Sequence, residues 1–175
     1  MDFSLSDEQQ SLQETARRFA QTEIAPNAAH YDQAGEFPRE IIKQAWELGL
    51  VSMCVPEVYG GVGLSMLDSC IAVEELAWGC AGMATSIMCN DLGLMPILVG
   101  GSEEQKKRWL TECTSEFKLV SFCLSEPNAG SDVAGMQLLA ERDGDHYVLN
   151  GTKCWITNGG EADLFTVFAT LDRAS

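Results

Sequence analysis

The 175-residue sequence is poor in basic residues, and this shortage excludes several classes of partner. It has 11 Lys and Arg against 26 Asp and Glu, which gives a formal net charge of −15 at pH 7. Nucleic-acid binding needs a basic patch that neutralises phosphates, and anionic membrane surfaces attract basic segments. We therefore expect no nucleic-acid partner, and we interpret the acidic charge mainly as a contribution to solubility.

Signatures of metal sites and disulfide frameworks are also missing. The only histidines are His30 and His146, and the seven cysteines form no Cys-x-x-Cys pair. A zinc site needs tighter ligand spacing, and a disulfide framework needs that spacing or a secreted context. We predict no metal site and buried, reduced thiols, as is typical of a reducing compartment.

Targeting and nucleotide motifs are absent as well. No basic segment followed by an apolar core opens the chain, so no signal peptide is predicted. The longest stretch of low charge, residues 81–101, contains Asn90, Asp91 and Pro96. We interpret it as buried helix rather than a membrane span. Neither G-x-G-x-x-G after a strand nor G-x-x-x-x-G-K occurs, which excludes the usual nicotinamide and ATP sites.

What is present in the first two thirds of the chain is helical patterning. Ser6 and Ser102 each precede a glutamine by three residues, which is a capping-box pattern, and Ser65 is a further N-cap candidate. We expect Pro26 to stop the first helix and Pro38 to occupy the first turn of the second.

The later helices carry two further signals. We expect the apolar helix from 83 to 99 to break near Gly93 and Pro96. Pairs of opposite charge four residues apart predict that the last helix has a solvent-facing side. These pairs are Glu103–Lys107 and Glu104–Arg108.

The pattern changes to strands after about residue 117. Alternating and β-branched residues predict strands and turns in this order: strand 119–124, hairpin 136–141 and 146–149, turn Asn150-Gly151, strand 152–156, strand 164–170. Such a meander needs more sheet to cover its edges, so we expect the sequence to stop inside its β domain.

Two loops in this region are candidates for chemistry. The turn 126–132 exposes backbone N–H groups and hydroxyls that can hold an anion or the edge of a ring. Trp155 follows a strand and can lie against a flat aromatic cofactor, with Thr157 reaching a ring nitrogen. Taken singly, each has a more common interpretation: an ordinary connection for the turn, and a core position for Trp155.

Considered jointly, five sequence blocks resemble the acyl-CoA dehydrogenase family, and they occur in that family's order along the whole chain. The medium-chain and related straight-chain members are the most similar, notably over residues 74–135. The blocks are Pro56-Glu57-x-Tyr59-Gly60-Gly61-x-Gly63, Glu74-Glu75-Leu76-Ala77, Gln105-Lys106, Ser125-Glu126-Pro127-x-Ala129-Gly130-Ser131-Asp132 and Asn150-Gly151-x-Lys153-x-Trp155-Ile156-Thr157-Asn158.

The resemblance implies an α+β fold. Residues 1–115 would form an all-α helical N-terminal domain, and residues 116–175 the first part of an antiparallel β-barrel-like middle domain. The C-terminal helical bundle of the family would be absent from this sequence. The acyl pocket of relatives lies around the helices near residues 83–94, where Met83, Ile87 and Met88 would make it apolar.

The resemblance also implies an FAD site. Leu124 and Ser125 would face the pyrimidine edge of the isoalloxazine, Trp155 would pack along the ring, and Thr157 would bond near N5. Ser131 would additionally lie close to the CoA part of the substrate. The implied cofactor-binding residues are Phe122, Leu124, Ser125, Gly130, Ser131, Trp155, Ile156 and Thr157. Phe122 stands where relatives often have tyrosine.

The implied reaction is α,β-dehydrogenation of an acyl-CoA thioester to trans-2-enoyl-CoA in fatty acid β-oxidation. A carboxylate removes the α-proton, FAD accepts the β-hydride, and an electron-transfer flavoprotein takes the electrons. In the family the base belongs to the C-terminal bundle, so no catalytic residue is expected here, although Glu57, Glu74, Glu75 and Glu126 are present. The isolated chain is expected to be inactive.

The resemblance leaves assembly and class open. A homo-oligomer, either a tetramer or a dimer, is expected for the full-length protein, in the cytoplasm of a bacterium or the mitochondrial matrix of a eukaryote. One alternative is a truncated, non-catalytic family member that binds a partner. The other is a fragment of an acyl-CoA oxidase-like relative, because fold alone does not separate these activities.

Overall fold

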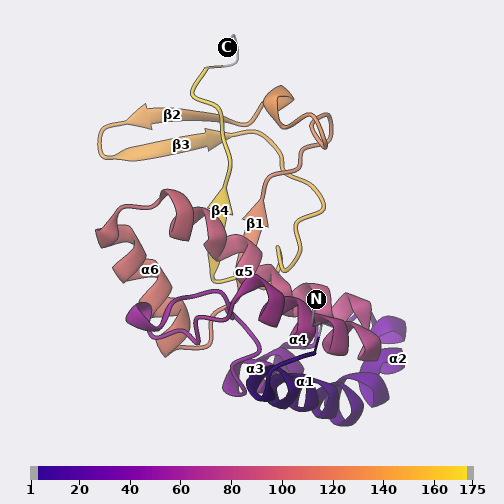
Figure 1. The fold of residues 1–175 in the computed structure, drawn as a ribbon. Helices are drawn as coiled ribbons and strands as arrows, with labels where there is room; N and C mark the ends of the chain where they lie inside the picture. The colour runs from indigo at the N-terminus through magenta and orange to yellow at the C-terminus, as the bar shows by residue number, and fades with distance from the viewer. Residues whose placement is uncertain (1–3, 173–175) are drawn as a thin grey trace.

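The computed structural model describes residues 4–172, which form a helical body with a smaller β region on one side (Figure 1). This confirms the predicted α+β class, although the strands form no closed barrel within the described residues. The helices are α1 (Asp7–Phe19), α2 (Ala25–Ala34), α3 (Arg39–Glu47), α4 (Met66–Gly79), α5 (Ala81–Gly100) and α6 (Glu103–Ser115). The strands are β1 (Val120–Cys123), β2 (Leu139–Asp143), β3 (His146–Asn150) and β4 (Leu164–Val167).

Three helices begin at the serines that the sequence marks as N-caps. The hydroxyls of Ser6, Ser65 and Ser102 each accept the backbone N–H three residues later, at 3.2 Å. The side chain at that third position bonds back to the serine N–H in each case, which completes a capping box. Two otherwise unpaired backbone donors are thereby satisfied at every one of these helix starts.

Pro26 does not stop the first helix, contrary to the prediction. α1 passes through a π-helical segment, Ala20–Ile24, directly into α2, and Pro26 lies in the first turn of α2. The hydrogen bonding changes from π-helical to α-helical directly before it, and this irregular turn accommodates a residue without an N–H inside a continuous helix. The helix ends instead at Gly35, whose φ of 66° is the left-handed conformation common at helix C-termini.

The predicted break in α5 is also wrong, because the helix runs continuously through Gly93 and Pro96. Gly93 serves close packing: a Cβ added there would lie 2.5 Å from Cγ1 of Val120 in β1. By length and apolar composition α5 would suit a membrane span, a property that the core helices of soluble proteins share. In the fold it packs against α4 on one side and β1 on another.

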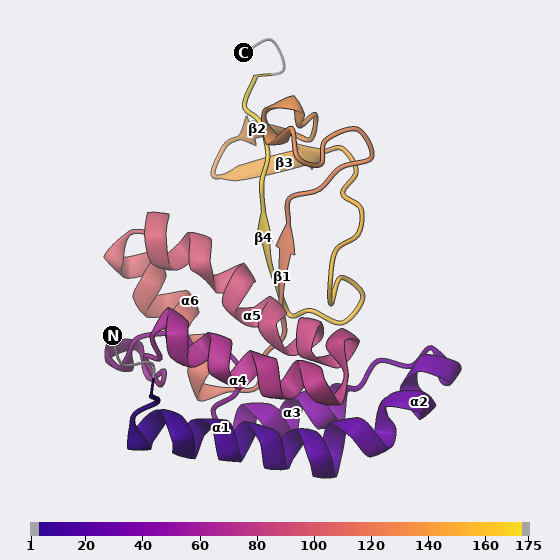
Figure 2. The same cartoon turned by 45° about the vertical axis from the view of Figure 1, so that its right-hand side comes forward.

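The core lies between these layers. Figure 2 shows α1, α4 and α5 stacked in succession beneath the β region, and the contacts between these elements agree. The fully buried side chains of this core include Ile24, Ile42, Leu76, Ile87 and Leu119. Glu75 is buried within this body and pairs with Arg17 of α1, so one of the carboxylates considered as a base has a structural partner.

The β region contains one pairing that the sequence did not predict. β1 pairs with β4 in parallel, with Val120 opposite Leu164. β2 and β3 form the predicted antiparallel hairpin, which turns at Gly144 with a φ of 60°. A parallel pair brings together residues far apart in sequence, so no local turn signal announces it.

Residues 152–156 form no strand, so the prediction of a hairpin at Asn150-Gly151 is wrong. β3 ends at Asn150, and a Cβ added at Gly151 would lie 2.6 Å from Cα of Leu138. The glycine therefore permits a close backbone approach rather than a turn between strands.

Two predictions about charged and sulfur-containing side chains need correction. Within the described part of the chain, Glu103 pairs with Lys106 at 3.0 Å, and the predicted pairs Glu103–Lys107 and Glu104–Arg108 do not form. The seven thiols are free, but only Cys89, Cys113 and Cys123 are buried; Cys70 is exposed, and Cys54, Cys80 and Cys154 are partly buried. Residues 4–172 contain no group of three His, Cys, Asp or Glu side chains able to hold a metal ion.

Candidate functional site

The two segments that carry the predicted flavin-facing residues lie side by side. One segment follows β1 and contains Leu124 and Ser125; the other follows β3 and contains Cys154. The backbone N–H of Cys154 donates to the carbonyl oxygen of Ser125 at 3.0 Å. Lys153 Nζ donates to the carbonyl oxygen of Leu124 at 2.8 Å. Residues almost 30 positions apart are thus held as one surface.

A buried ion pair fastens these segments. Glu126 Oε1 lies 2.8 Å from Lys153 Nζ, and their side chains are only 5% and 9% exposed. The Glu126 carboxylate also accepts the backbone N–H groups of Gln137 at 2.6 Å and Leu138 at 3.0 Å. Burial raises the pKa of Glu126, but Lys153 and these two N–H donors outweigh it and lower the pKa to about 2. Glu126 therefore stays ionised and has a structural role.

The loop after Lys153 is anchored on β1 and α5. The carbonyl oxygen of Thr157 accepts the Ser121 hydroxyl at 2.8 Å and the Cys89 thiol at 3.5 Å. Asn158 Nδ2 donates to the carbonyl oxygen of Ser86 at 2.9 Å. Trp155 and Asn158 have φ values of 57° and 60°, a left-handed conformation that asparagine tolerates but a bulky side chain such as Trp155 rarely adopts. These anchors stabilise a backbone shape that is intrinsically unfavourable.

Several hydrogen-bond donors on this surface are unused. The backbone N–H groups of Leu124, Ser125 and Thr157, and the hydroxyls of Ser125 and Thr157, have no hydrogen-bond partner within residues 4–172. The side chain of Trp155 beside them is 92% exposed. An open indole next to free donors fits a planar aromatic group with a polar edge.

The other predicted residues occupy more varied positions. Phe122 in β1 is half-buried against Phe168, with ring centroids 5.0 Å apart. Ile156 is also half-buried, while Gly130 and Ser131 are exposed in the turn that begins at Glu126. That turn is closed by reciprocal backbone hydrogen bonds between Glu126 and Ala129, at 2.9 and 3.2 Å.

An apolar cavity of about 480 Å³ opens beside Thr157, between α4 and α5. Of the residues predicted to line an acyl pocket, Met88 does so, whereas Met83 and Ile87 are buried in the helical core. The lining residues are Met53, Cys54, Met66, Ser69, Val73, Thr85, Met88, Cys89, Asp91, Leu92, Met95 and Thr157. Thr157 therefore belongs both to this cavity and to the donor-rich surface.

Two residues with titratable side chains at the cavity wall, Cys54 and Asp91, are hydrogen-bonded through the Cys54 backbone. The backbone N–H of Cys54 donates to Asp91 Oδ1 at 2.7 Å. Burial, followed by the proximity of Asp91, raises the pKa of the Cys54 thiol to about 12. Burial also raises the pKa of Asp91. A thiol with so high a pKa is not a nucleophile at neutral pH, so this pair has no evident catalytic use.

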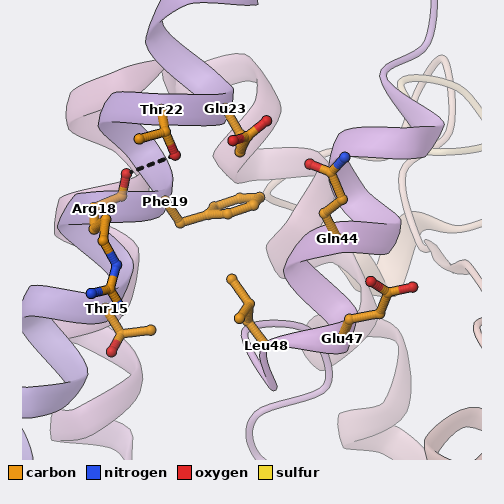
Figure 3. Close-up of a pocket in the computed structure, with 8 residues that line it drawn as sticks. All are labelled: Thr15, Arg18, Phe19, Thr22, Glu23, Gln44, Glu47 and Leu48. Atoms are coloured by element: carbon orange, nitrogen blue, oxygen red, sulfur yellow. Dashed lines mark hydrogen bonds between the residues drawn. The ribbon is translucent and has the colours of Figure 1, made fainter.

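A second groove, of about 430 Å³, lies between α1 and α3 (Figure 3). Phe19 and Leu48 extend into it, and Arg18, Glu23 and Glu47 stand around it. The hydrogen bonds among its lining residues include two that stay within a helical segment, from Thr22 Oγ1 to the Arg18 carbonyl oxygen at 3.1 Å and from the Leu48 N–H to the Gln44 carbonyl oxygen at 3.2 Å. None of the predicted site residues lines this groove, so the candidate site is the surface around Thr157.

Two models of known protein families match this chain. A model described as the acyl-CoA dehydrogenase N-terminal domain matches residues 6–116, and one described as the middle domain matches residues 121–175. The chain belongs to the acyl-CoA dehydrogenase family. The predicted resemblance is thereby confirmed.

Individual relatives agree with this family assignment. The chain is 43% identical to a probable medium-chain specific mitochondrial acyl-CoA dehydrogenase of Caenorhabditis briggsae, over 98% of this chain and 42% of that protein. Butyryl-CoA dehydrogenase of Megasphaera elsdenii superposes with a TM-score of 0.91 at 39% identity, over 100% of this chain and 47% of that one.

A third similar protein is glutaryl-CoA dehydrogenase of Mycobacterium smegmatis in complex with FADH2. Its TM-score is 0.87 at 35% identity, over 95% of this chain and 43% of that one. The chain thus spans just under half of the length of the relatives that it matches.

The sequence did not indicate several residues of this chain that shape the site. Thr85, Leu92 and Met95 line the cavity with Met88, at the three- and four-residue spacing of one helix face. That spacing was available in the sequence. The bonds from Ser121 and Cys89 to Thr157 were not, because they join three elements distant along the chain.

Proposed function

We propose that this chain is part of an FAD-dependent acyl-CoA dehydrogenase that converts acyl-CoA thioesters to trans-2-enoyl-CoA. The observation that carries the proposal is the position of Thr157, which lines an apolar cavity and borders the surface of unused donors. An acyl chain needs the first environment, and a flavin ring edge needs the second. In this proposal residues 1–115 are the helical domain and residues 116–175 belong to the middle domain.

The residues present fit the flavin of FAD. Trp155 would lie along the isoalloxazine ring, Leu124 and Ser125 would donate to its pyrimidine edge, and Thr157 would donate near N5. When bound, FAD supplies the acceptor for the β-hydride of the substrate. The glutaryl-CoA dehydrogenase that resembles this chain is in complex with FADH2, which supports the choice of cofactor. Phe122, Ile156, Gly130 and Ser131 would complete the contact surface, Ser131 also toward CoA.

In this function the chain binds and orients rather than transfers the α-proton. The cavity would hold the acyl chain away from water, with Met88, Leu92 and Met95 adapting to its shape. Glu75 and Glu126 are buried in ion pairs with Arg17 and Lys153, so neither is free to act as the base. The base is expected in the C-terminal bundle typical of the family.

The remaining assignments follow the family. Electrons would pass to an electron-transfer flavoprotein, and the full-length protein would assemble as a homo-oligomer, a tetramer or a dimer. The location would be the mitochondrial matrix in a eukaryote and the cytoplasm in a bacterium.

Trp155 provides a direct test in the full-length protein. Trp155→Ala is compared with Trp78→Ala, which removes another exposed indole, 56% exposed, that lies against Arg17 and does not line the cavity. We expect wild-type and Trp78→Ala proteins to retain a flavin absorbance band after desalting and to oxidise acyl-CoA with a dye as acceptor. Trp155→Ala should lose most of the band, because the ring loses its stacking face.

The electron acceptor in the turnover assay distinguishes a dehydrogenase from an oxidase. Rapid turnover with oxygen in place of the dye would assign an acyl-CoA oxidase instead. A wild-type protein with neither flavin nor turnover would favour a non-catalytic binding role. Full flavin retention in Trp155→Ala would contradict the proposed placement of the ring.

A further inference from the structure

Helix α5 has two adjacent faces that make different contacts. Thr85, Met88, Leu92 and Met95 line the apolar cavity. A neighbouring stripe at the same helical spacing is hydrogen-bonded to the β region, and its residues are Ser86, Cys89, Asn90 and Gly93. A rigid helix that forms the cavity wall therefore also fixes the loop that contains Thr157.

Thr157 lies where these two faces meet. Its carbonyl oxygen accepts one donor from α5, the Cys89 thiol, and one from β1, the Ser121 hydroxyl. Two donors from different elements fix the orientation of a peptide plane, because rotation would break both bonds at once. With its carbonyl turned inward, the residue keeps its own N–H and hydroxyl unpaired within residues 4–172.

Of the two anchors, Ser121 is the stronger. Its bond is 2.8 Å from an O–H donor, whereas the bond from Cys89 is 3.5 Å from a thiol, which donates weakly. Ser121 is also 0% exposed, and Thr157 is the one partner of its hydroxyl among the described residues. A buried hydroxyl without a partner is costly, so the serine and the Thr157 carbonyl hold each other in place.

We propose that Ser121 is a positioning residue for the dehydrogenation, acting through Thr157. Its hydroxyl fixes the peptide between Thr157 and Asn158, and thereby the Thr157 Cα from which the free N–H and side-chain hydroxyl project toward the flavin. Ser121 itself touches neither flavin nor substrate in this arrangement. The inference rests on the proposed function, because it assigns a direction to donors whose partner is the flavin ring.

Three variants of the full-length protein test this role. Ser121→Ala removes the donor, Ser121→Thr restores a hydroxyl, and Val120→Ala weakens the neighbouring core position of β1 without a bond to Thr157. The first measurement is amide hydrogen exchange of residues 156–160 in the apoprotein. We expect exchange about tenfold faster in Ser121→Ala, the factor for one lost hydrogen bond. The exchange rate of Ser121→Thr should be closer to that of wild type. Val120→Ala should speed the exchange of residues 156–160 no more than its lower overall stability requires.

The second measurement is steady-state turnover of the FAD-loaded enzyme. We expect kcat of Ser121→Ala to fall about tenfold with little change in KM, since one positioned donor is disturbed and the acyl cavity is intact. If the wild-type enzyme is active and Ser121→Ala matches Val120→Ala in both measurements, the positioning role of Ser121 is refuted while the proposed function stands. Wild-type protein without flavin or turnover would overturn the proposed function, and the role of Ser121 with it.

Discussion

The buried pair between Glu126 and Lys153 allows a quantitative prediction about the site's framework. Lys153→Met in the full-length protein keeps most of the side chain's length and removes its charge. The Glu126 carboxylate would then be buried with only the backbone donors of Gln137 and Leu138. Removing one partner of a buried pair typically costs about 3–5 kcal/mol, and the two retained bonds should lower this to about 2–4 kcal/mol.

The pair's contribution should depend on pH in a defined direction. The folded-state pKa of Glu126 is about 2, below the ordinary value of 4.5, so the folded state binds fewer protons than the unfolded state between these values. Its stabilisation is therefore complete above about pH 4.5 and is lost as the pH falls toward 2. Lys153→Met should flatten the pH dependence of unfolding in this window.

Urea denaturation at several pH values, with amide exchange at Gln137 and Leu138, measures both effects. Glu126→Gln and the double variant Glu126→Gln/Lys153→Met complete a double-mutant cycle. The double variant should cost clearly less than the sum of the single ones, because neither charge is then left unpaired. Additive costs, or a loss below about 1 kcal/mol for Lys153→Met, would refute the assignment of the pair as a buried clamp.

Two other features give predictions of their own. Gly93→Ala should destabilise the full-length protein by about 1–3 kcal/mol in thermal unfolding, because the new methyl would lie 2.5 Å from Val120; unchanged stability would show that α5 and β1 separate freely. Maleimide labelling at pH 8 should modify Cys70 first, since it is exposed, and leave Cys54 unmodified in the folded protein, since its thiol pKa is about 12. Mass spectrometry after proteolysis distinguishes the two sites, and equal labelling would contradict the described burial.

The local elements of the fold were predictable from the sequence. The three helix starts at Ser6, Ser65 and Ser102 depend on contacts within one turn, so the serine and its third neighbour carry the full signal. The proline and glycine signals gave wrong predictions at positions where the surrounding structure decides whether a helix continues. Pro26 and Gly93 both occur inside continuous helical segments, one where the hydrogen bonding changes from π-helical to α-helical and one where β1 approaches closely.

The candidate site was predictable only in part. The motif blocks brought residues 124–131 and 155–157 to attention, and the structure places Leu124 and Ser125 beside the Trp155 loop. The ion pair that joins these segments could not be predicted, because Lys153 and Glu126 are 27 positions apart in the sequence. Either side chain could equally have been exposed on the surface. The roles assigned to the individual flavin-facing residues stay predictions.

The side chain of Asn90 has a consequence for association between molecules. β1 is paired with β4 along one edge, and on the opposite edge the Asn90 amide binds the carbonyl oxygen of Lys118 at 2.7 Å and the N–H of Val120 at 2.8 Å. A helix side chain thus occupies the backbone groups that a foreign strand would need. Because an open strand edge is a template for aggregation, this asparagine blocks intermolecular β-pairing at the start of that edge of β1.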